Sequence, residues 1–237
     1  MAIALLQDPL CNGEAARHVA EAVRRGQAFD LAGAATSYAA AVQAGCAAAR
    51  SPLIYLRGLL AARAANEQFG SAASVAPVKQ AITELEKDAA AYPAVRAMQT
   101  VLRAALPAAQ HERAEMGLFI EEMLRMESIQ LEAQQPPLPV LSAHEAAGQF
   151  WLQLHLYEEA RRAFERAAQR IGPTPHVMLG AARAAAGLKQ LPAACEQYRR
   201  LVTWWKDRPG SPPEISEART FIKQPSCAAP SPPPVRR

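Results

Sequence analysis

Four cysteines and five histidines are the residues of this chain best suited to ligate a metal ion or to act as nucleophiles. The cysteines form no CxxC pair and do not cluster with histidines at the spacing of a zinc site. His111 and His144 are each followed by Glu, but neither is followed by the second His that a metalloprotease helix requires. We therefore expect no metal site.

Other catalytic patterns are also missing from the sequence. There is no Gly-rich phosphate loop, no GxSxG turn, and no Ser or Cys with an arguable His partner. Adjacent acids such as Glu121 and Glu122 project about 100 degrees apart on a helix, so they do not form a pair of catalytic acids. We expect a protein without catalytic residues and without a cofactor.

Composition favours helices. The chain has 237 residues, 53 of them alanine, with 6% aromatic residues and a net charge of +4. Alanine is the strongest helix former, which predicts an all-α fold. No apolar run approaches the roughly 18 residues of a membrane span, and the first residues lack a complete export signal.

The sequence repeats with a period of 34 residues between about 141 and 208. Small residues at fixed places let two helices approach closely, and a large residue fills the space against the next unit. The matching positions are Gly148, Trp151, Tyr157, Ala160, Phe164 and Ala167 in the first unit, and Ala182, Ala185, Leu191, Ala194, Tyr198 and Leu201 in the second. The pattern predicts two helical hairpins, followed by a short capping helix over 214–222.

This pattern resembles the tetratricopeptide repeat. The resemblance extends upstream to a hairpin over 13–45 and to a second one with helices over 52–67 and 77–92, separated by an inserted loop. Helices over 94–105 and 107–133 are similar to a degenerate third hairpin. The resemblance implies a right-handed solenoid of antiparallel helical hairpins of the bacterial type, with a C-terminal capping helix.

The predicted organisation has four parts. They are degenerate hairpins over 1–133, a Pro-rich linker loop over 134–140, two regular units with a cap over 141–223, and a disordered Pro-rich tail over 224–237. In the helix over 107–133, a stripe that runs from Met116 to Ile129 is expected to face the core.

In tetratricopeptide proteins the concave face is lined mainly by the first helix of each hairpin. Here those positions lack the Lys and Asn that clamp a C-terminal carboxylate in peptide-binding members, and they form a mixed apolar and polar groove. The candidate groove residues are Gln149, Gln153, His176 and Arg183. The resemblance implies a non-enzymatic scaffold or adaptor that binds a segment of another protein.

Two other functions stay open: a structural accessory domain of an exported or enzyme-associated assembly, and an RNA-binding helical repeat. Arginines do gather over 157–171, but Glu158 and Glu165 lie at ion-pair spacing from Arg161. No aromatic residue is interleaved to stack bases. We therefore expect no nucleic-acid site on this helix.

The order of the predicted helices indicates how the cysteines could pair. Cys11 precedes and Cys46 follows the first hairpin, whose two ends meet; Cys195 begins the last repeat helix and Cys227 follows the cap. Two disulfides, 11–46 and 195–227, would staple the two ends of the solenoid and imply an oxidising compartment, such as a periplasm or the cell exterior. The alternative is four reduced cysteines in a cytoplasmic protein.

Overall fold

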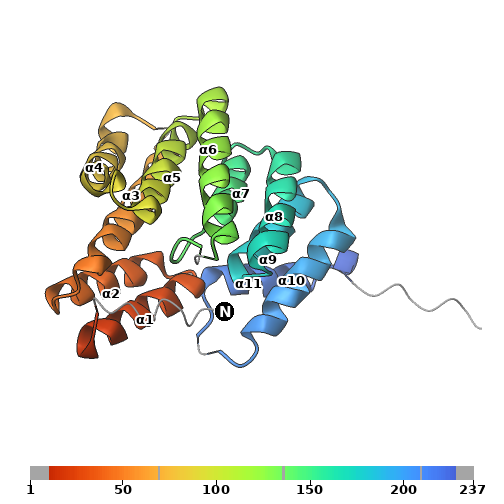
Figure 1. The fold of residues 1–237 in the computed structure, drawn as a ribbon. Coiled ribbons are helices and arrows are strands. Elements are labelled where there is room, and N and C mark those ends of the chain that lie inside the picture. Colours follow the sequence, from red (N-terminus) through yellow and green to blue (C-terminus); the bar gives the residue numbers. More distant parts are fainter. Residues whose placement is uncertain (1–10, 69, 135–136, 209, 228–237) are drawn as a thin grey trace, which may run out of the picture.

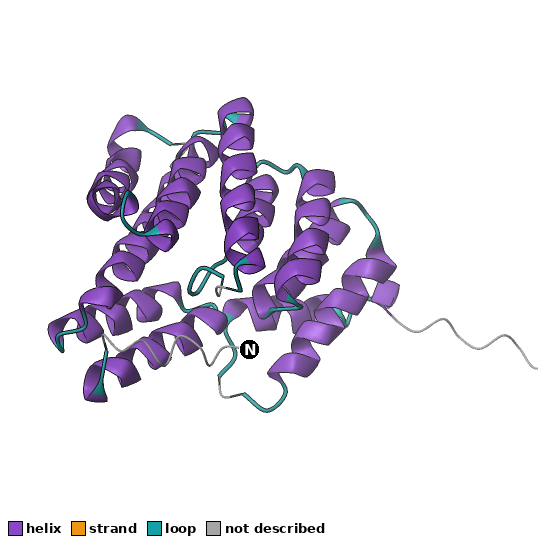
Figure 2. Ribbon diagram, viewed as in Figure 1, coloured by secondary structure: helices purple, strands orange, loops and turns teal. Residues whose placement is uncertain are grey.

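The structure is a computed structural model, and it describes residues 11–68, 70–134, 137–208 and 210–227. Every regular element in these ranges is helical, which confirms the all-α prediction (Figure 2). The α-helices are α1 (Gly13–Gln27), α2 (Leu31–Gln43), α3 (Arg50–Glu67), α4 (Ala72–Ala89), α5 (Pro93–Ala109), α6 (Arg113–Glu132), α7 (Ala143–Gln153), α8 (Tyr157–Ile171), α9 (Pro175–Gly187), α10 (Leu191–Trp205) and α11 (Pro213–Phe221). Two 3-10 helices, η2 (Ala47–Ala49) and η3 (Pro225–Cys227), complete the described elements. None of the described helices is both long and apolar enough to cross a membrane.

Four pairs of consecutive helices, α1 with α2, α5 with α6, α7 with α8 and α9 with α10, are joined by the same turn. The residue after the C-cap has a positive φ near 60° at Phe29, His111, His155 and Lys189. The next backbone N–H then donates to the carbonyl five residues earlier, as from Leu156 to Trp151 at 3.0 Å. This Schellman geometry satisfies carbonyls that the helix end leaves free. In α7–α8 and α9–α10 the positive-φ residues are 34 positions apart, the period of the sequence repeat.

The packing between these last pairs centres on Phe164 of α8, which is fully buried. A Cβ built on Gly148 of α7 would lie 2.5 Å from the Phe164 ring, and one on Gly180 of α9 would lie 2.0 Å from it. The ring therefore fits only because both neighbouring helices present a glycine.

Several predicted boundaries are wrong. The loop expected between the helices over 52–67 and 77–92 is shorter, because α4 begins at Ala72 and contains Pro77. α5 extends through Pro107 to Ala109, and α6 begins only at Arg113. Each proline gives up one backbone hydrogen bond. Burial offsets that cost: Val75, near the start of α4, is fully buried against Ala109, near the end of α5.

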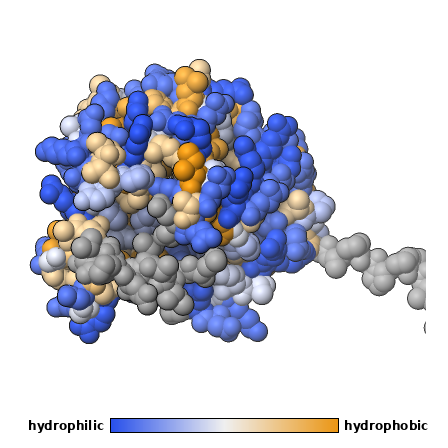
Figure 3. Space-filling model, in the orientation of Figure 1, coloured by the Kyte–Doolittle hydropathy of each residue, from blue (hydrophilic) through white to orange (hydrophobic). Residues whose placement is uncertain are grey.

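The stripe predicted for α6 is also partly wrong. Met116, Ile120 and Met123 are buried as expected, but Ile129 is 54% exposed and the buried face continues through Glu127. A hydrophobic stripe crosses the otherwise largely hydrophilic surface over α6 (Figure 3). The core-facing side of α6 thus includes a polar residue, Glu127, four residues after Met123, where the predicted stripe contained only apolar residues.

The helices follow one another around an arc that brings α9 and α10 near the turn between α1 and α2 (Figure 1). The turn after α1 meets α9, where His176 Nε2 lies 2.8 Å from the Gly26 carbonyl oxygen. The Phe29 ring packs edge-on against His176 and stacks on Trp205 of α10, with centroids 4.7 Å and 6.2 Å apart. The turn between α1 and α2 thus contacts both α9 and α10.

The Pro-rich linker contributes to the core. Leu138 and Leu141 are buried in a hydrophobic cluster that runs from α1 to α8. The parts expected on either side of the linker therefore share one core. The ordered chain also extends beyond the predicted start of the tail, through η3 to Cys227, and residues 228–237 lie outside the described residues.

Both predicted cysteine pairs are joined by disulfides in the structure. Cys11 is bonded to Cys46 with a Cα–Cα distance of 5.0 Å, and Cys195 is bonded to Cys227 with a Cα–Cα distance of 5.4 Å. The second bridge ties η3 to the first turn of α10, beside α11. Each bridge therefore lies in one of the two terminal units that meet where the arc closes.

Removing either bridge should lower stability, because it frees a loop in the unfolded chain. The sequence separations of 35 and 32 residues correspond to about 3–4 kcal/mol each in the chain-entropy model. We expect denatured, unreduced protein to show no free thiols, and C11S/C46S and C195S/C227S to melt at lower temperatures. Four titratable thiols in protein made under oxidising conditions would contradict the pairing.

The glycine packing can be tested with two matched substitutions. Gly180→Ala would place its methyl group against Phe164, so we expect a loss of about 1–3 kcal/mol in urea unfolding. Gly117→Ala on α6 is the control: its nearest neighbour, Trp151 Cη2, would be 3.8 Å away. Better helix propensity should make that variant more stable by about 0.5–1 kcal/mol. Equal stability of the two variants would argue against the close approach.

Candidate functional site

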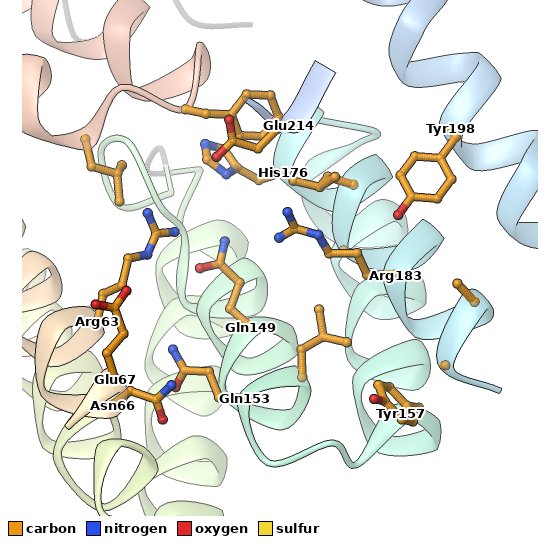
Figure 4. Close-up of a pocket in the computed structure, with 17 residues that line it drawn as sticks. Arg63, Asn66, Glu67, Gln149, Gln153, Tyr157, His176, Arg183, Tyr198 and Glu214 are labelled. Carbon is orange, nitrogen blue, oxygen red and sulfur yellow. The ribbon is translucent and has the colours of Figure 1, made fainter. Parts of the chain in front are cut away.

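A pocket of about 590 Å³ lies between α3, α7 and α9. All four residues predicted for the groove line it: Gln149 and Gln153 from α7, and His176 and Arg183 from α9 (Figure 4). The opposite wall, which was not predicted from the sequence, is formed by Arg63, Asn66 and Glu67 of α3. α3 comes to lie opposite α7 and α9 because the helices follow an arc. The repeat pattern of the sequence does not encode this arrangement and so could not predict the wall.

The glutamines are positioned by a buried carboxylate on α6. Glu127 is fully buried, and its Oε1 and Oε2 accept hydrogen bonds from the backbone N–H groups of Ala143 and His144, both at 2.9 Å. The His144 ring also lies against it, with Nδ1 2.5 Å from Oε2. These amides are the first two of α7, where a helix leaves its N–H groups unpaired and favours negative charge. Glu127 therefore fixes the start of the helix that carries Gln149 and Gln153.

A second carboxylate connects α7 to α9. Ser142 and Glu145 form a capping box, with Ser142 N–H donating to Glu145 at 2.9 Å and Glu145 N–H donating to the Ser142 hydroxyl at 3.1 Å. The other oxygen of Glu145 accepts a hydrogen bond from the hydroxyl of Thr174, the N-cap of α9. The two helices that form one wall of the pocket thus begin at linked caps.

The same junction reaches α3 through Tyr55. Its hydroxyl donates to the Leu141 carbonyl at 2.9 Å in the interior. Burial, and then the negative charges of Glu127 and Glu145, raise the pKa of Tyr55 well above its ordinary value. The phenol therefore stays neutral and remains a hydrogen-bond donor.

Two of the predicted groove residues have structural partners. His176 is 7% exposed, and it holds the turn after α1 through a hydrogen bond to Gly26 and a contact with the Phe29 ring. Arg183 binds Glu217 of α11 through two nitrogens, at 3.0 and 2.5 Å. Both residues line the pocket, but they also connect its wall to the ends of the chain.

Glu217 is a charged partner of both Arg183 and Tyr198. Burial raises the pKa of Glu217. Three effects lower it and together outweigh burial: the hydrogen bond from Arg183, the hydrogen bond from the Tyr198 hydroxyl at 2.7 Å, and the positive charge of Arg183. The net pKa is below the ordinary value of 4.5. The carboxylate therefore stabilises the folded state above that value and loses this contribution as the pH falls.

A pH-dependent comparison tests this contact. We expect Glu217→Gln to melt at a lower temperature than wild type at pH 7, because the ion pair with Arg183 is lost. As the pH falls below about 4.5, the wild-type carboxylate also loses its charge, so the difference between the two melting temperatures should narrow. A difference that stays constant from pH 7 to pH 3 would contradict this assignment.

Several other polar side chains of the pocket have no partner among the described residues, although the Tyr157 hydroxyl lies 3.0 Å from His155 Nδ1. Asn66, Gln149 and Gln153 make no hydrogen bond through their side chains to any described residue, and the Asn66 Oδ1 atom is buried without a donor. Arg63 is exposed and has no ion-pair partner among the described residues. Its guanidinium points into the pocket from one side and that of Arg183 from the other, with the Gln149 amide between them (Figure 4).

The pocket offers donors and acceptors but no described group of three metal-ligating side chains. The arginines on α8 lie outside it, and two of the four form ion pairs with glutamates of the same helix. Arg161 pairs with Glu158 at 2.7 Å and with Glu165, and Arg162 pairs with Glu158 at 3.2 Å. The spacing argument from sequence therefore predicted these ion pairs correctly.

Removing the negative charge of Glu127 should destabilise the whole protein. Glu127→Gln keeps one acceptor but places an NH₂ group among donors, so we expect a loss of about 2–4 kcal/mol in chemical unfolding. Glu132→Gln, exposed at the end of the same helix, should change stability by less than about 0.5 kcal/mol. Equal effects of the two substitutions would show that Glu127 does not hold α7.

No family model matches this chain, and comparisons with curated proteins and with solved structures also find no match. Neither a family nor a homologous fold therefore assigns a role to the pocket. Functional inference starts from the side chains that line it and from the elements that hold them.

Proposed function

We propose that the protein is a non-enzymatic scaffold or adaptor that holds a segment of a partner protein in the pocket between α3, α7 and α9. The observation that carries this proposal is a set of unpaired polar side chains in a pocket whose walls are rigidly fixed. Gln149 and Gln153 have no partner within the described chain, whereas the helix that carries them is anchored by Glu127. Positioned but unpaired donors and acceptors are typical of a binding site.

The proposed architecture is a right-handed solenoid of antiparallel helical hairpins that resembles the tetratricopeptide repeat. Three observations support it: the identical turn in four helix pairs, the 34-residue spacing of His155 and Lys189, and the packing of the Phe164 ring between two glycines. α11 would be the cap. Its Ile215 and Ala218 are buried in the cluster that contains Trp205.

The closed arc makes the binding surface shorter than in an open solenoid. Phe29 lines one end of the pocket and packs against the opposite end of the chain. A volume of about 590 Å³ lies within the range of ligand pockets, and it suits a few residues of a partner rather than a long helix. We therefore propose a short segment as the ligand.

Nucleic acid is a weaker candidate, because positive charge at the pocket is balanced. Arg63 and Arg183 are accompanied by Glu67 and Glu214 in the lining and by Glu217, which binds Arg183 directly. A site for phosphates concentrates unpaired cations. This balance disfavours the RNA-binding alternative.

The two disulfides support the other alternative, a structural domain in an exported assembly. Bridges that staple both terminal units suit an oxidising compartment, and we propose that the protein works in a periplasm or outside the cell. The structural alternative needs no open pocket, so blocking the pocket distinguishes it from the scaffold function.

The test is affinity capture from an extract of the source cells with three proteins. Gln153→Trp fills the pocket, and Gln43→Trp adds the same side chain on the exposed end of α2. We expect a partner protein to be retained by wild type and by Gln43→Trp but lost with Gln153→Trp. A partner retained equally by all three would place binding elsewhere, and recovery of nucleic acid without protein would contradict the proposal.

A further inference from the structure

Three primary amides are among the polar side chains of the pocket that have no partner in the described part of the chain. Asn66 comes from α3, and Gln149 and Gln153 come from α7, so the amides approach the pocket from two sides (Figure 4). The buried Oδ1 of Asn66 lacks a donor within the described chain. A buried acceptor without a partner is costly, and a ligand that brings an N–H group would remove that cost.

The charges around these amides nearly cancel. Arg183 is bound by Glu217, and Arg63 lies on the same helix as Glu67, which also lines the pocket. Glu214 adds a further negative group beside Arg183. A strongly anionic or cationic ligand would meet like charge here, whereas a neutral ligand rich in donors and acceptors would not.

A primary amide carries the same acceptor and donor groups as a peptide unit. One Asn or Gln side chain can therefore accept from the N–H and donate to the C=O of a single ligand residue. Extended polypeptide leaves these backbone groups free and points alternate side chains to opposite sides. Leu152, Leu179 and Ala186 offer apolar surface in the same pocket for such side chains.

We propose that the occupant of the pocket is a short, uncharged, extended polypeptide segment that is recognised mainly through its backbone by Asn66, Gln149 and Gln153. This inference rests on the proposed function and adds the conformation and chemistry of the ligand. Recognition through the backbone also predicts tolerance for sequence, limited by the small apolar wall.

The test uses octapeptides selected from a random library displayed on phage, with the disulfide-bonded full chain as the target. The same library is selected in parallel on Gln153→Trp, and peptides that are enriched on wild type but not on this variant are those that enter the pocket. One such peptide, acetylated and amidated at its ends, is then synthesised with single backbone amides replaced by esters. Each ester keeps the side chains but removes one N–H donor.

We expect selected sequences to be poor in charged residues, and one or two ester replacements to weaken binding about three- to tenfold. Gln149→Ala and Gln153→Ala should weaken binding by a similar factor. When a Gln→Ala variant already lacks the side chain that pairs with a given ligand N–H, replacing that N–H by an ester should weaken binding little further. The hydrogen bond between the two groups is then already absent. Gln43→Ala, on the exposed end of α2, should bind like wild type.

The outcomes separate the two proposals. Peptides that need the open pocket but are indifferent to every ester and to both Gln→Ala changes would overturn backbone recognition and leave the scaffold function standing. A requirement for several acidic or basic ligand residues would also overturn it. Failure of any peptide to be enriched on wild type over Gln153→Trp would overturn the proposed function itself.

Discussion

The carboxylate of Glu127 has no contact with solvent, so its charge must be balanced by the first amides of α7 and by His144. An unpaired charge in the interior is costly, and the same group becomes tolerable once hydrogen bonds satisfy it. The bonds cross from α6 to α7 over the Pro-rich connection, which is itself packed through Leu138. The two halves of the chain must therefore come together before this charge is compensated, and the position of α7 follows from it.

The second constraint is the closure of the arc. In a row of helical repeats the terminal units each lack one neighbour and expose apolar surface there. Here the turn after α1 covers part of the surface of α9 and α10, since Phe29 packs with Trp205 and His176 binds Gly26. The disulfides Cys11–Cys46 and Cys195–Cys227 constrain these same terminal units. The contact that closes the arc also forms one end of the pocket, because Phe29 belongs to both. This contact therefore limits the size of ligand that the pocket can hold.

At the junction of α3, α6, α7 and α9, the buried side chains of Tyr55, Glu127 and Glu145 all have partners, whereas Gln130 Oε1 of α6 has none among the described residues. In the pocket a short distance away, Asn66 Oδ1 is likewise buried without a donor from the described part of the chain. Sites where a chain departs from local hydrogen-bond satisfaction are often functional. A rigid frame with unpaired amides is suited to recognise another backbone, which is why the proposed ligand is a peptide rather than a charged polymer.

Several features follow from local patterns and were predictable from the sequence: the all-α fold, the helical character of the 34-residue units, the ion pairs of Arg161 and both cysteine pairings. Each depends on propensity, on a 34-residue spacing or on helices adjacent in the chain, so its signal lies within a short window. Gln149, Gln153, His176 and Arg183 were predicted in the same way, by their place on the first helix of each unit, and all four line the pocket. Other features were decided only by the tertiary structure. Glu127, and not Ile129, faces the core on α6, where its carboxylate accepts hydrogen bonds from the first amides of α7; Asn66 became a pocket residue because the arc brought α3 opposite α7 and α9. Pro77 and Pro107 entered helices because burial of their neighbours outweighed the lost hydrogen bonds. These outcomes depend on contacts between residues far apart in sequence, which periodicity does not encode.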